Sequence, residues 1–421
     1  MTMHKPPRRV VVVDGARRYT VTLKPADFIA SGATGDVYRL RGHSHGHGKA
    51  CIKLYRTPDS HSANKLTAMI ERPPVDIRQH HAGKDFIRFA WPSHQVEDGN
   101  GSVIGFVMPE IDFQRTRSMV TYTERRESQR FLTPEQRSLP RRLALCANLC
   151  ALMSDLHSQG HAFVDFKDQN VRVYPDQDLV GFIDTDGFRI QGHGNRCFPG
   201  QHTTPTFNSP ESVNGPKSAL GEHHDHFVLA ILLFRILNMG VHPFQGIPKN
   251  STHNPGTAFS VDDHIAGQIY PYGAHACQGL APTQGSLHGL WGSRTLAMFE
   301  QTFTTRTPGE RVSAHDWMIH FRELQRKSMA RCQNHPSNIE HVHFAGNRCP
   351  ICAVNESATP SSIPTPASPP SQSMQVTGLQ AGGLPQAATL PPPEPRWHPG
   401  ARFFLATLIA VATLAAVGIA L

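Results

Sequence analysis

The sequence has few features of a secreted or disulfide-stabilised protein. Its eight cysteines are too few and too scattered for a disulfide scaffold in a chain of 421 residues. Near the N-terminus the apolar stretch Val10 to Val13 is too short to form the core of a signal peptide. We therefore expect the N-terminal part of the chain to lie in a reducing compartment, the cytoplasm.

The excess of charge is also small. The chain has 41 Lys and Arg against 33 Asp and Glu, which gives a net charge of +8. Such a balance suits nucleotides, anionic lipids or nucleic acid without selecting among them. Because the charge is spread thinly along the sequence, we do not expect nucleic acid as a partner.

A long stretch near the C-terminus lacks the residues that build a core. Between about residues 354 and 401 the composition turns to Pro, Ser, Ala and Gln, with almost no aromatic residues. Such a segment cannot bury enough apolar surface to offset its chain entropy. We expect a flexible linker of residues 354–401.

The last segment, residues 402–421, is the one long apolar run. Phe403 to Leu421 has 19 residues without a charge, and at about 1.5 Å per residue it crosses most of a hydrocarbon core about 30 Å thick. Arg396 and Arg402 on its N-terminal side favour a cytoplasmic location for that side. The pattern predicts a single-pass C-terminal anchor in the cell (inner) membrane and contact with the lipid bilayer.

The part before the linker predicts two lobes of an α+β fold. From Val10 to about Ile111, short β-branched runs alternate with Gly, Pro and His, with one helix expected at Ser62 to Glu71. Beyond that point helical spacing dominates, and Asp225 to Asn238 is apolar on almost every side, as in a buried helix. We expect a β-rich N-terminal lobe to about residue 111 and an α-rich C-terminal lobe after it.

Two segments of the first lobe have residue types suited to phosphate binding. Gly32 and Gly35 lie between β-like runs, and residues without a Cβ let backbone amides approach phosphate oxygens, although a simple hairpin turn explains the same pattern. Val37 follows them. Downstream, a short strand carries Lys53, which suits the α- and β-phosphates of a nucleotide.

The second lobe contains the run Asp165-Phe166-Lys167-Asp168-Gln169-Asn170. Its order and spacing resemble the catalytic loop of eukaryotic-type Ser/Thr protein kinases. The resemblance implies that Asp165 orients the acceptor hydroxyl and takes its proton, that Lys167 steadies the γ-phosphate, and that Asn170 holds Mg²⁺. It covers about residues 25–327, implies a bilobal kinase-like fold there, and leaves residues 1–24 as a separate N-terminal segment.

A second kinase-like run, Asp184-Thr185-Asp186-Gly187-Phe188, follows a short apolar strand. Kinases carry Asp-Phe-Gly at this place, and a carboxylate at a strand end can fix the metal that holds the phosphates. We favour the register in which Asp184 is the Mg²⁺ ligand and Asp186 stands where the family has Gly. The register with Asp186-Gly187-Phe188 as the motif remains open.

Further motifs follow in the order of the family. Thr204 to Glu211 resembles the end of an activation segment, and Arg311 lies where the family pairs an arginine with that glutamate. The chain resembles a bacterial branch of the family with an Asp-x-Asp variant and a C-terminal zinc ribbon.

Two departures from the family matter for mechanism. Phe163-Val164 stands where most members have His-Arg, so no arginine is available there to bind a phosphorylated activation loop. The helical glutamate that usually pairs with the lysine is expected at Glu71, although two prolines closely follow it. Met108 is expected to be the gatekeeper of the adenine pocket, although an ordinary core methionine would explain its position equally well.

A metal site is predicted in residues 328–353. Cys332 and His335, followed by Cys349 and Cys352, have the two-knuckle spacing of a zinc ribbon, with His341 or His343 as alternatives to His335. Because protein ligands fill all four positions, the Zn²⁺ would be structural.

These expectations combine into one functional reading with one alternative. The chain is expected to be a membrane-anchored protein kinase, a phosphotransferase acting in bacterial signalling, that uses ATP, Mg²⁺ and structural Zn²⁺ and phosphorylates Ser or Thr of protein substrates. The residues expected to contact the nucleotide or its metal are Gly32, Gly35, Val37, Lys53, Glu71, Met108, Asn170 and Asp184. The alternative is a pseudokinase scaffold that recruits partners, and perhaps nucleotide, to the membrane.

Overall fold

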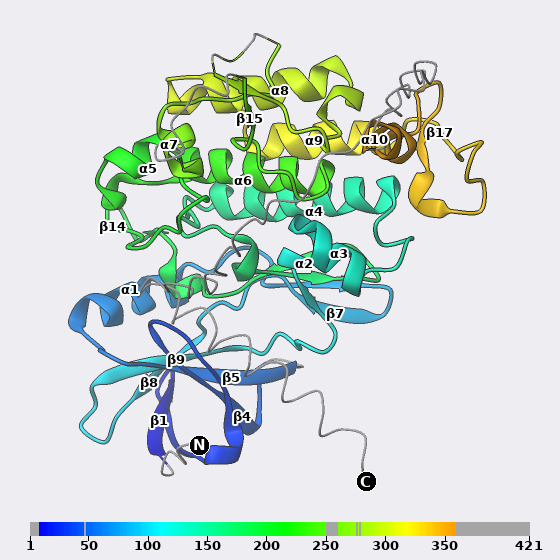
Figure 1. Cartoon of the computed structure of the whole chain (residues 1–421). Helices are drawn as coiled ribbons and strands as arrows, with labels where there is room; N and C mark the ends of the chain where they lie inside the picture. Colours follow the sequence, from blue (N-terminus) through cyan, green and yellow to red (C-terminus); the bar gives the residue numbers. More distant parts are fainter. Residues whose placement is uncertain (1–7, 46–47, 250–259, 275–276, 278, 359–421) are drawn as a thin grey trace, which may run out of the picture. The chain divides into compact units, whose positions relative to one another are not determined.

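A seven-stranded antiparallel sheet forms the N-terminal lobe in the computed structural model (Figure 1). The structure describes residues 8–45, 48–249, 260–274, 277 and 279–358, all within one unit of the chain. In spatial order the strands are β2 (Arg17–Leu23), β1 (Arg8–Asp14), β8 (His94–Glu97), β9 (Val103–Pro109), β5 (Gly48–Tyr55), β4 (Gly35–His45) and β3 (Phe28–Ser31).

Alternating side chains of these strands build a small core of their own. Val10, Val12, Ile52 and Val96 are almost fully buried on its inner face, as expected when one face of an antiparallel sheet is covered and the other is solvated. Residues 8–23, which the sequence places before the kinase-like domain, form the hairpin β1–β2 and pair with β8 of this sheet.

The only α-helix of this lobe among the described residues is α1 (Ser60–Glu71). Asp59 caps its N-terminus by accepting a hydrogen bond from the backbone N–H of Ser62, which satisfies one of the free amides of the first turn. The helix ends just before Pro73, where the chain cannot continue as a helix. Leu66 and Met69 on its buried side belong to the large core that continues into the second lobe.

The C-terminal lobe is mainly helical. Its helices are α2 (Val120–Thr123), α3 (Arg125–Phe131), α4 (Leu139–Ser158), α5 (Pro210–Asn214), α6 (Glu222–Leu237), α7 (Val261–Ala266), α8 (Ser293–Thr304) and α9 (Ala314–Gln325). Helix α6 is buried over almost its whole length, which confirms the buried helix expected from Asp225 onward. The mixture of a curled sheet and a helical lobe fits the predicted kinase-like α+β fold.

Short strands line the junction of the lobes and the surface loops. The three-stranded sheet consists of β10 (Arg117–Ser118), β11 (Val171–Tyr174) and β12 (Leu179–Phe182). The two-stranded sheets are β6 (Arg78–His81) with β7 (Lys84–Ile87), β13 (Ile190–Gln191) with β14 (Cys197–Phe198), β15 (Ile247–Pro248) with β16 (Leu280–Ala281), and β17 (Met329–Ala330) with β18 (His343–Phe344). Strands β11 and β12 carry the two kinase-like runs at their ends.

The chain continues past the second lobe into a small module. Strands β17 and β18 and helix α10 (Pro350–Ala358) form it, so the first residues of the predicted linker are helical. Glu340 of this module forms an ion pair with Arg137, which lies just before α4. Within the described residues no helix is long and apolar enough to cross a membrane; the predicted span, residues 402–421, lies outside them, as does most of the predicted linker.

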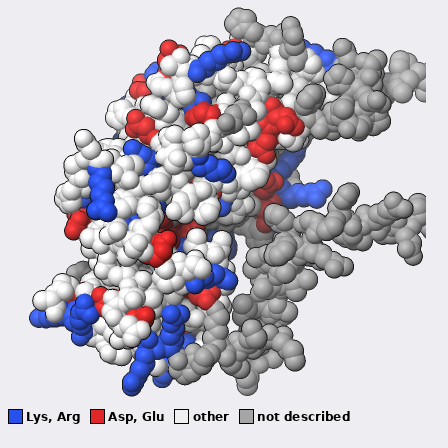
Figure 2. All heavy atoms as spheres, turned by 90° about the vertical axis from the view of Figure 1, so that its left-hand side faces the viewer, with Lys and Arg blue, Asp and Glu red and all other residues white. Residues whose placement is uncertain are grey.

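Positive charge gathers on the N-terminal lobe. Figure 2 shows blue Lys and Arg side chains at the lower end of the molecule, where Figure 1 places β1 and β4. Residues 8–56 have only Asp14, Asp27 and Asp36 as acids against the cations Arg8, Arg9, Arg17, Arg18, Lys24, Arg39, Arg41, Lys49, Lys53 and Arg56. The charge is therefore less evenly spread than expected, although several of these arginines pair with carboxylates, such as Arg39 with Glu110.

Candidate active site between the lobes

The side chains of the predicted catalytic loop meet at one point. The Lys167 ammonium donates hydrogen bonds to Asp165 Oδ2 at 2.7 Å and to Thr204 Oγ1 at 2.9 Å. The Thr204 hydroxyl in turn donates to Asp165 Oδ1 at 2.7 Å. A carboxylate that accepts a hydrogen bond from a hydroxyl at this distance has the geometry a general base requires.

The backbone of this loop is held by a buried carboxylate. Asp225 of α6 is fully buried and accepts hydrogen bonds from the N–H groups of Phe163 at 2.6 Å and Val164 at 2.9 Å. Val164 has φ +64°, which is strained for a β-branched residue and persists only where the surroundings enforce it. His224 completes the restraint, because its Nε2 lies 2.9 Å from the Val164 carbonyl oxygen.

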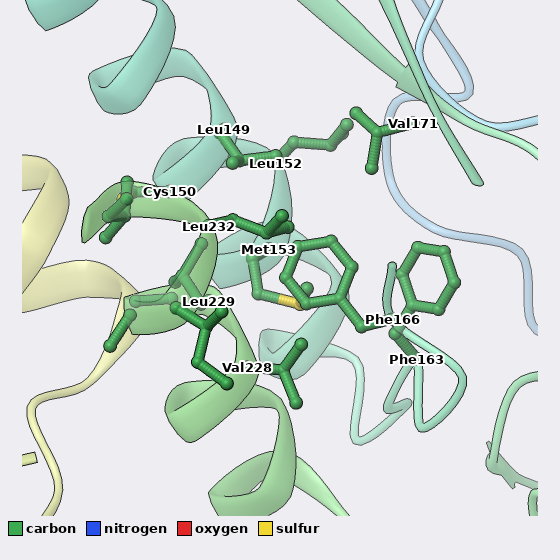
Figure 3. Packing of buried hydrophobic residues seen from close by; sticks show 14 of the residues in the cluster. Leu149, Cys150, Leu152, Met153, Phe163, Phe166, Val171, Val228, Leu229 and Leu232 are labelled. Carbon is green, nitrogen blue, oxygen red and sulfur yellow. The ribbon is translucent and has the colours of Figure 1, made fainter. Parts of the chain in front are cut away.

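Aromatic side chains anchor the same loop in the core. Phe163 and Phe166 are buried in the cluster that includes Met153 of α4 and Val228 of α6 (Figure 3). The Phe163 and Phe166 rings lie 5.0 Å apart between centroids. Thus Phe163, which replaces a polar residue of the family pattern, stabilises the loop by packing.

The second kinase-like run brings two carboxylates to the lysine of the sheet. The Lys53 ammonium donates hydrogen bonds of 2.6 Å both to Asp184 Oδ1 and to Asp186 Oδ1. Burial alone would lower the pKa of Lys53, but the carboxylates of Asp186 and Asp184 outweigh it, so this pKa is raised and the amine stays charged.

The two predicted Mg²⁺ ligands lie on neighbouring segments. The Asn170 carbonyl oxygen accepts a hydrogen bond of 3.0 Å from the N–H of Ile183, the residue before Asp184. The Asn170 side-chain amide donates to the Asp165 carbonyl oxygen at 3.1 Å. Oxygen atoms of Asn170 and Asp184 suit a hard cation such as Mg²⁺, and the ion would neutralise phosphate charge beside Lys53.

The chain is similar to two proteins named as protein kinases. It matches no protein-family profile. It is 30% identical over 315 residues to protein kinase YegI of Escherichia coli strain K12, a match that covers 72% of this chain and 45% of that protein. The corresponding protein kinase YegI of strain O157:H7 is 27% identical over 350 residues, or 80% of this chain and 50% of the relative. The chain thus spans about half the length of these relatives.

The ion pair that the sequence predicted between Arg311 and Glu211 is present. The Arg311 guanidinium donates to the two carboxylate oxygens of Glu211 at 2.6 and 2.8 Å. It also donates to the carbonyl oxygen of His223 at 2.8 Å. A bidentate pair with a buried arginine fixes geometry strongly, and it lowers the pKa of Glu211 although partial burial opposes that change.

Glu71 does not meet Lys53, contrary to the expectation from the sequence. It lies in the last turn of α1, its side chain is 50% exposed, and it pairs with His193 at 3.5 Å. The helix ends immediately after it, so the side chain points away from the sheet lysine. The acids that Lys53 contacts come instead from the segment after β12.

One of the buried residues of α1 is a lysine, which the sequence analysis missed. Lys65 is 8% exposed, and burial lowers its pKa to about 8 against the opposing attraction of Asp186. Its place one position before Leu66 and four before Met69 is the helical spacing that could have revealed a buried cation.

The two glycines of the predicted phosphate loop differ in what they require. A Cβ at Gly35 would lie 2.3 Å from the carbonyl oxygen of Leu54, so only glycine permits the pairing of β4 with β5. A Cβ at Gly32 would have nothing nearer than 3.7 Å. Val37 lies directly opposite Lys53 in this pairing, so both side chains lie on the same face of the sheet.

Met108 lies on the same face of the sheet as Lys53, two residues along β9 from Phe106, the residue paired with Lys53. It is paired with Cys51, and Lys53 is paired with Phe106. The half-buried Met108 packs with Ile183 against a small cluster that includes Ala90 and Ile111. The gatekeeper role of Met108 remains a prediction.

The C-terminal module gathers three cysteines and one histidine. The possible ligand atoms of Cys332, His341, Cys349 and Cys352 lie within 4.8 Å of one another, and all four residues are buried. His341 Nδ1 lies 3.5 Å from the sulfur atoms of Cys349 and Cys352. A Cys3His set at these separations is compatible with tetrahedral zinc.

The fourth member of the cluster is His341, one of the alternatives that the sequence left open, and not His335. His335 is exposed, and its ring lies tilted against that of His341, with 4.4 Å between the ring centroids. The 3-10 turn Ile339–His341 directs the His341 ring inward, a local conformation that the spacing of the cysteines does not reveal.

Proposed function

We propose that the chain is an ATP-dependent protein kinase that phosphorylates Ser or Thr of protein substrates. The observation that carries the proposal is the meeting of segments far apart in the sequence. Lys53 contacts Asp184, the segment before Asp184 pairs with Asn170, and Asn170 contacts the loop that carries Asp165. Positioning and charge stabilisation are the main demands of phosphoryl transfer, and these groups supply both.

Each residue of the site has a separate role in the proposed reaction. Asp165 accepts the proton of the acceptor hydroxyl as its oxygen bonds to the γ-phosphorus, while the bond to the β-phosphate oxygen breaks. Lys167, which is bonded to Asp165, offsets charge on the transferred group. Asn170 and Asp184 would hold the Mg²⁺. The hydroxyl of Thr204 beside Asp165 supports a preference for Ser and Thr acceptors.

Phosphotransfer by the full chain tests this proposal. The chain is incubated with labelled ATP, Mg²⁺ and a generic acceptor that has Ser, Thr and Tyr, and the labelled residue is identified. We expect label on Ser or Thr and a loss of roughly 10²- to 10⁴-fold in Asp165→Asn, the range for a general base. Undiminished transfer in Asp165→Asn would contradict the assignment, and label on Tyr would contradict the specificity.

We also propose that the kinase acts at the inner membrane with its folded lobes in the cytoplasm. The apolar sequence 402–421 and the flanking arginines support this. A linker of about 45 residues spans on the order of 35 to 40 Å as a flexible coil. Extraction of cell membranes with alkaline carbonate should leave the full chain in the pellet and release a variant truncated after residue 401; release of both would reject the anchor.

A pseudokinase scaffold is the second candidate. It is favoured by the Lys53 ammonium, which is already bonded to both carboxylates, and by the absence of an arginine at Val164. A native-state ligand must raise the melting temperature, so a lack of stabilisation by Mg-ATP together with a lack of transfer would favour the scaffold.

A further inference from the structure

We propose that Asp186 is the positioning residue of Lys53, in the role that kinases give to a helical glutamate, which leaves Asp184 for the metal. The inference rests on the proposed kinase activity. It concerns the two hydrogen bonds of 2.6 Å that Lys53 makes to these acids.

Burial separates the two carboxylates. The side chain of Asp186 is 7% exposed and that of Lys53 is 5% exposed, whereas the side chain of Asp184 is 48% exposed. A buried carboxylate is stable only when it is paired, so Asp186 and Lys53 depend on each other. The exposed Asp184 has free solvent access, which a ligand for a nucleotide-bound metal needs.

Helix α1 has no acid to offer to Lys53. Glu71 pairs with His193, and the buried ionisable residue of α1 is Lys65, whose charge interacts favourably with Asp186 and unfavourably with Lys53. Two buried cations on this side require a buried anion near both, and Asp186 meets that requirement. The lysine is therefore positioned by the segment after β12, and not by α1.

A short turn places the two acids side by side. Asp184 has φ +60°, and a 3-10 turn from Thr185 to Gly187 follows it. The buried Thr185 hydroxyl donates to the Ala90 carbonyl oxygen at 2.8 Å. That anchor turns residue 185 away from the cleft and leaves the carboxylates of residues 184 and 186 facing Lys53.

A double-mutant cycle on the full chain tests the inference, because only interacting residues show coupled effects. We expect Asp186→Asn to lower kcat/KM for ATP at least about tenfold, and Asp186→Glu to recover part of the loss. In a Lys53→Met background, Asp186→Asn should change kcat/KM less than about threefold. The Mg²⁺ concentration for half-maximal rate should shift in Asp184→Asn and stay unchanged in Asp186→Asn.

One control variant and one replacement variant make each outcome decisive. Glu71→Gln should match the wild type. Should Asp186→Asn fail to fold, the charge-balanced Lys65→Met/Asp186→Asn variant replaces it, with the same expected loss. Equal losses with and without Lys53, or an Mg²⁺ shift like that of Asp184→Asn, would overturn the positioning role while leaving the kinase proposal intact. A wild-type chain that neither transfers phosphate nor binds Mg-ATP would overturn both.

Discussion

The two sides of the candidate active site are stabilised by different interactions. On the catalytic-loop side, Asp165 lies in a loop fixed by backbone hydrogen bonds to the buried Asp225 and by packed phenylalanines. On the lysine side, Lys53 is held by ion pairs to residues more than a hundred positions away. The catalytic-loop residues themselves are close in sequence, from Asp165 to Asn170, so their spacing can be recognised without the structure. The lysine side depends on charge balance, so another acid can take over a partner's role.

The largest expected effect is on the catalytic-loop side. Asp225→Ala removes the acceptor of two buried N–H groups and of His157 at 3.0 Å, so we expect a loss of about 3 to 5 kcal/mol of unfolding free energy. Urea unfolding measures it. The matched control is Glu323→Ala, which removes an exposed ion pair with Arg294 and should cost less than about 1 kcal/mol. Equal costs would show that the loop does not depend on Asp225.

The next effect concerns the Cys3His cluster of the C-terminal module, the candidate zinc site. His341→Ala should weaken zinc binding at least about tenfold, as expected for loss of a ligand, whereas His335→Ala should leave it unchanged. Competition with a chromogenic chelator measures the affinity. Because Glu340 pairs with Arg137, zinc removal should also speed amide exchange near residues 132–142 and leave β5 protected. The opposite ranking of the two histidines would reject His341 as the fourth ligand.

Acid should weaken the helical side more than the lysine side. Burial, then the nearby Arg235, lowers the pKa of His242 to about 3, so it is neutral in the fold and takes up a proton on unfolding below about pH 6.5. Its contribution is therefore full above pH 6.5 and falls by about 1.4 kcal/mol per pH unit as the pH drops toward 3. The raised pKa of Lys53 acts oppositely: its contribution is lost only as the pH rises through the folded value.

Urea unfolding between pH 7 and pH 4 compares the wild type with His242→Asn. In the wild type, the Phe244 N–H donates a hydrogen bond to His242 Nδ1 at 3.2 Å. The Asn side chain keeps an acceptor for this N–H, but the Asn side chain does not titrate. We expect the unfolding free energy of the variant to depend less steeply on pH, with up to one proton fewer taken up on unfolding. Parallel curves would show that His242 does not contribute to the acid sensitivity.

The smallest effect is expected for Glu71 of α1, which the sequence analysis had assigned as the partner of Lys53. Glu71 and His193 are exposed partners, and such pairs contribute little. Glu71→Gln should change the unfolding free energy by less than about 0.5 kcal/mol and kcat/KM for ATP by less than about twofold. A tenfold loss of kcat/KM would mean that α1 moves Glu71 to Lys53 during the reaction, and the two sides of the candidate active site would then be less different than the structure indicates.

Several errors of the sequence reading have one origin. Glu71 was chosen by distance along the chain, and His335 by the spacing of a knuckle, but neither spacing reports the direction of a side chain. Residues 8–23 carried no motif, yet they complete the sheet through β1 and β8. Direction and long-range pairing depend on where a helix ends or a turn forms, which are tertiary outcomes.

The sequence by itself determined the order of the lobes, the buried helix α6 and the residues of the catalytic loop, because short spacings and apolar periodicity act over a few residues. Only the tertiary structure decided that Asp186 and Lys65 share the surroundings of Lys53 and that His341 joins the cysteines. Those groupings follow from burial: charges and ligands brought out of water must find partners nearby in space, whatever their distance in sequence.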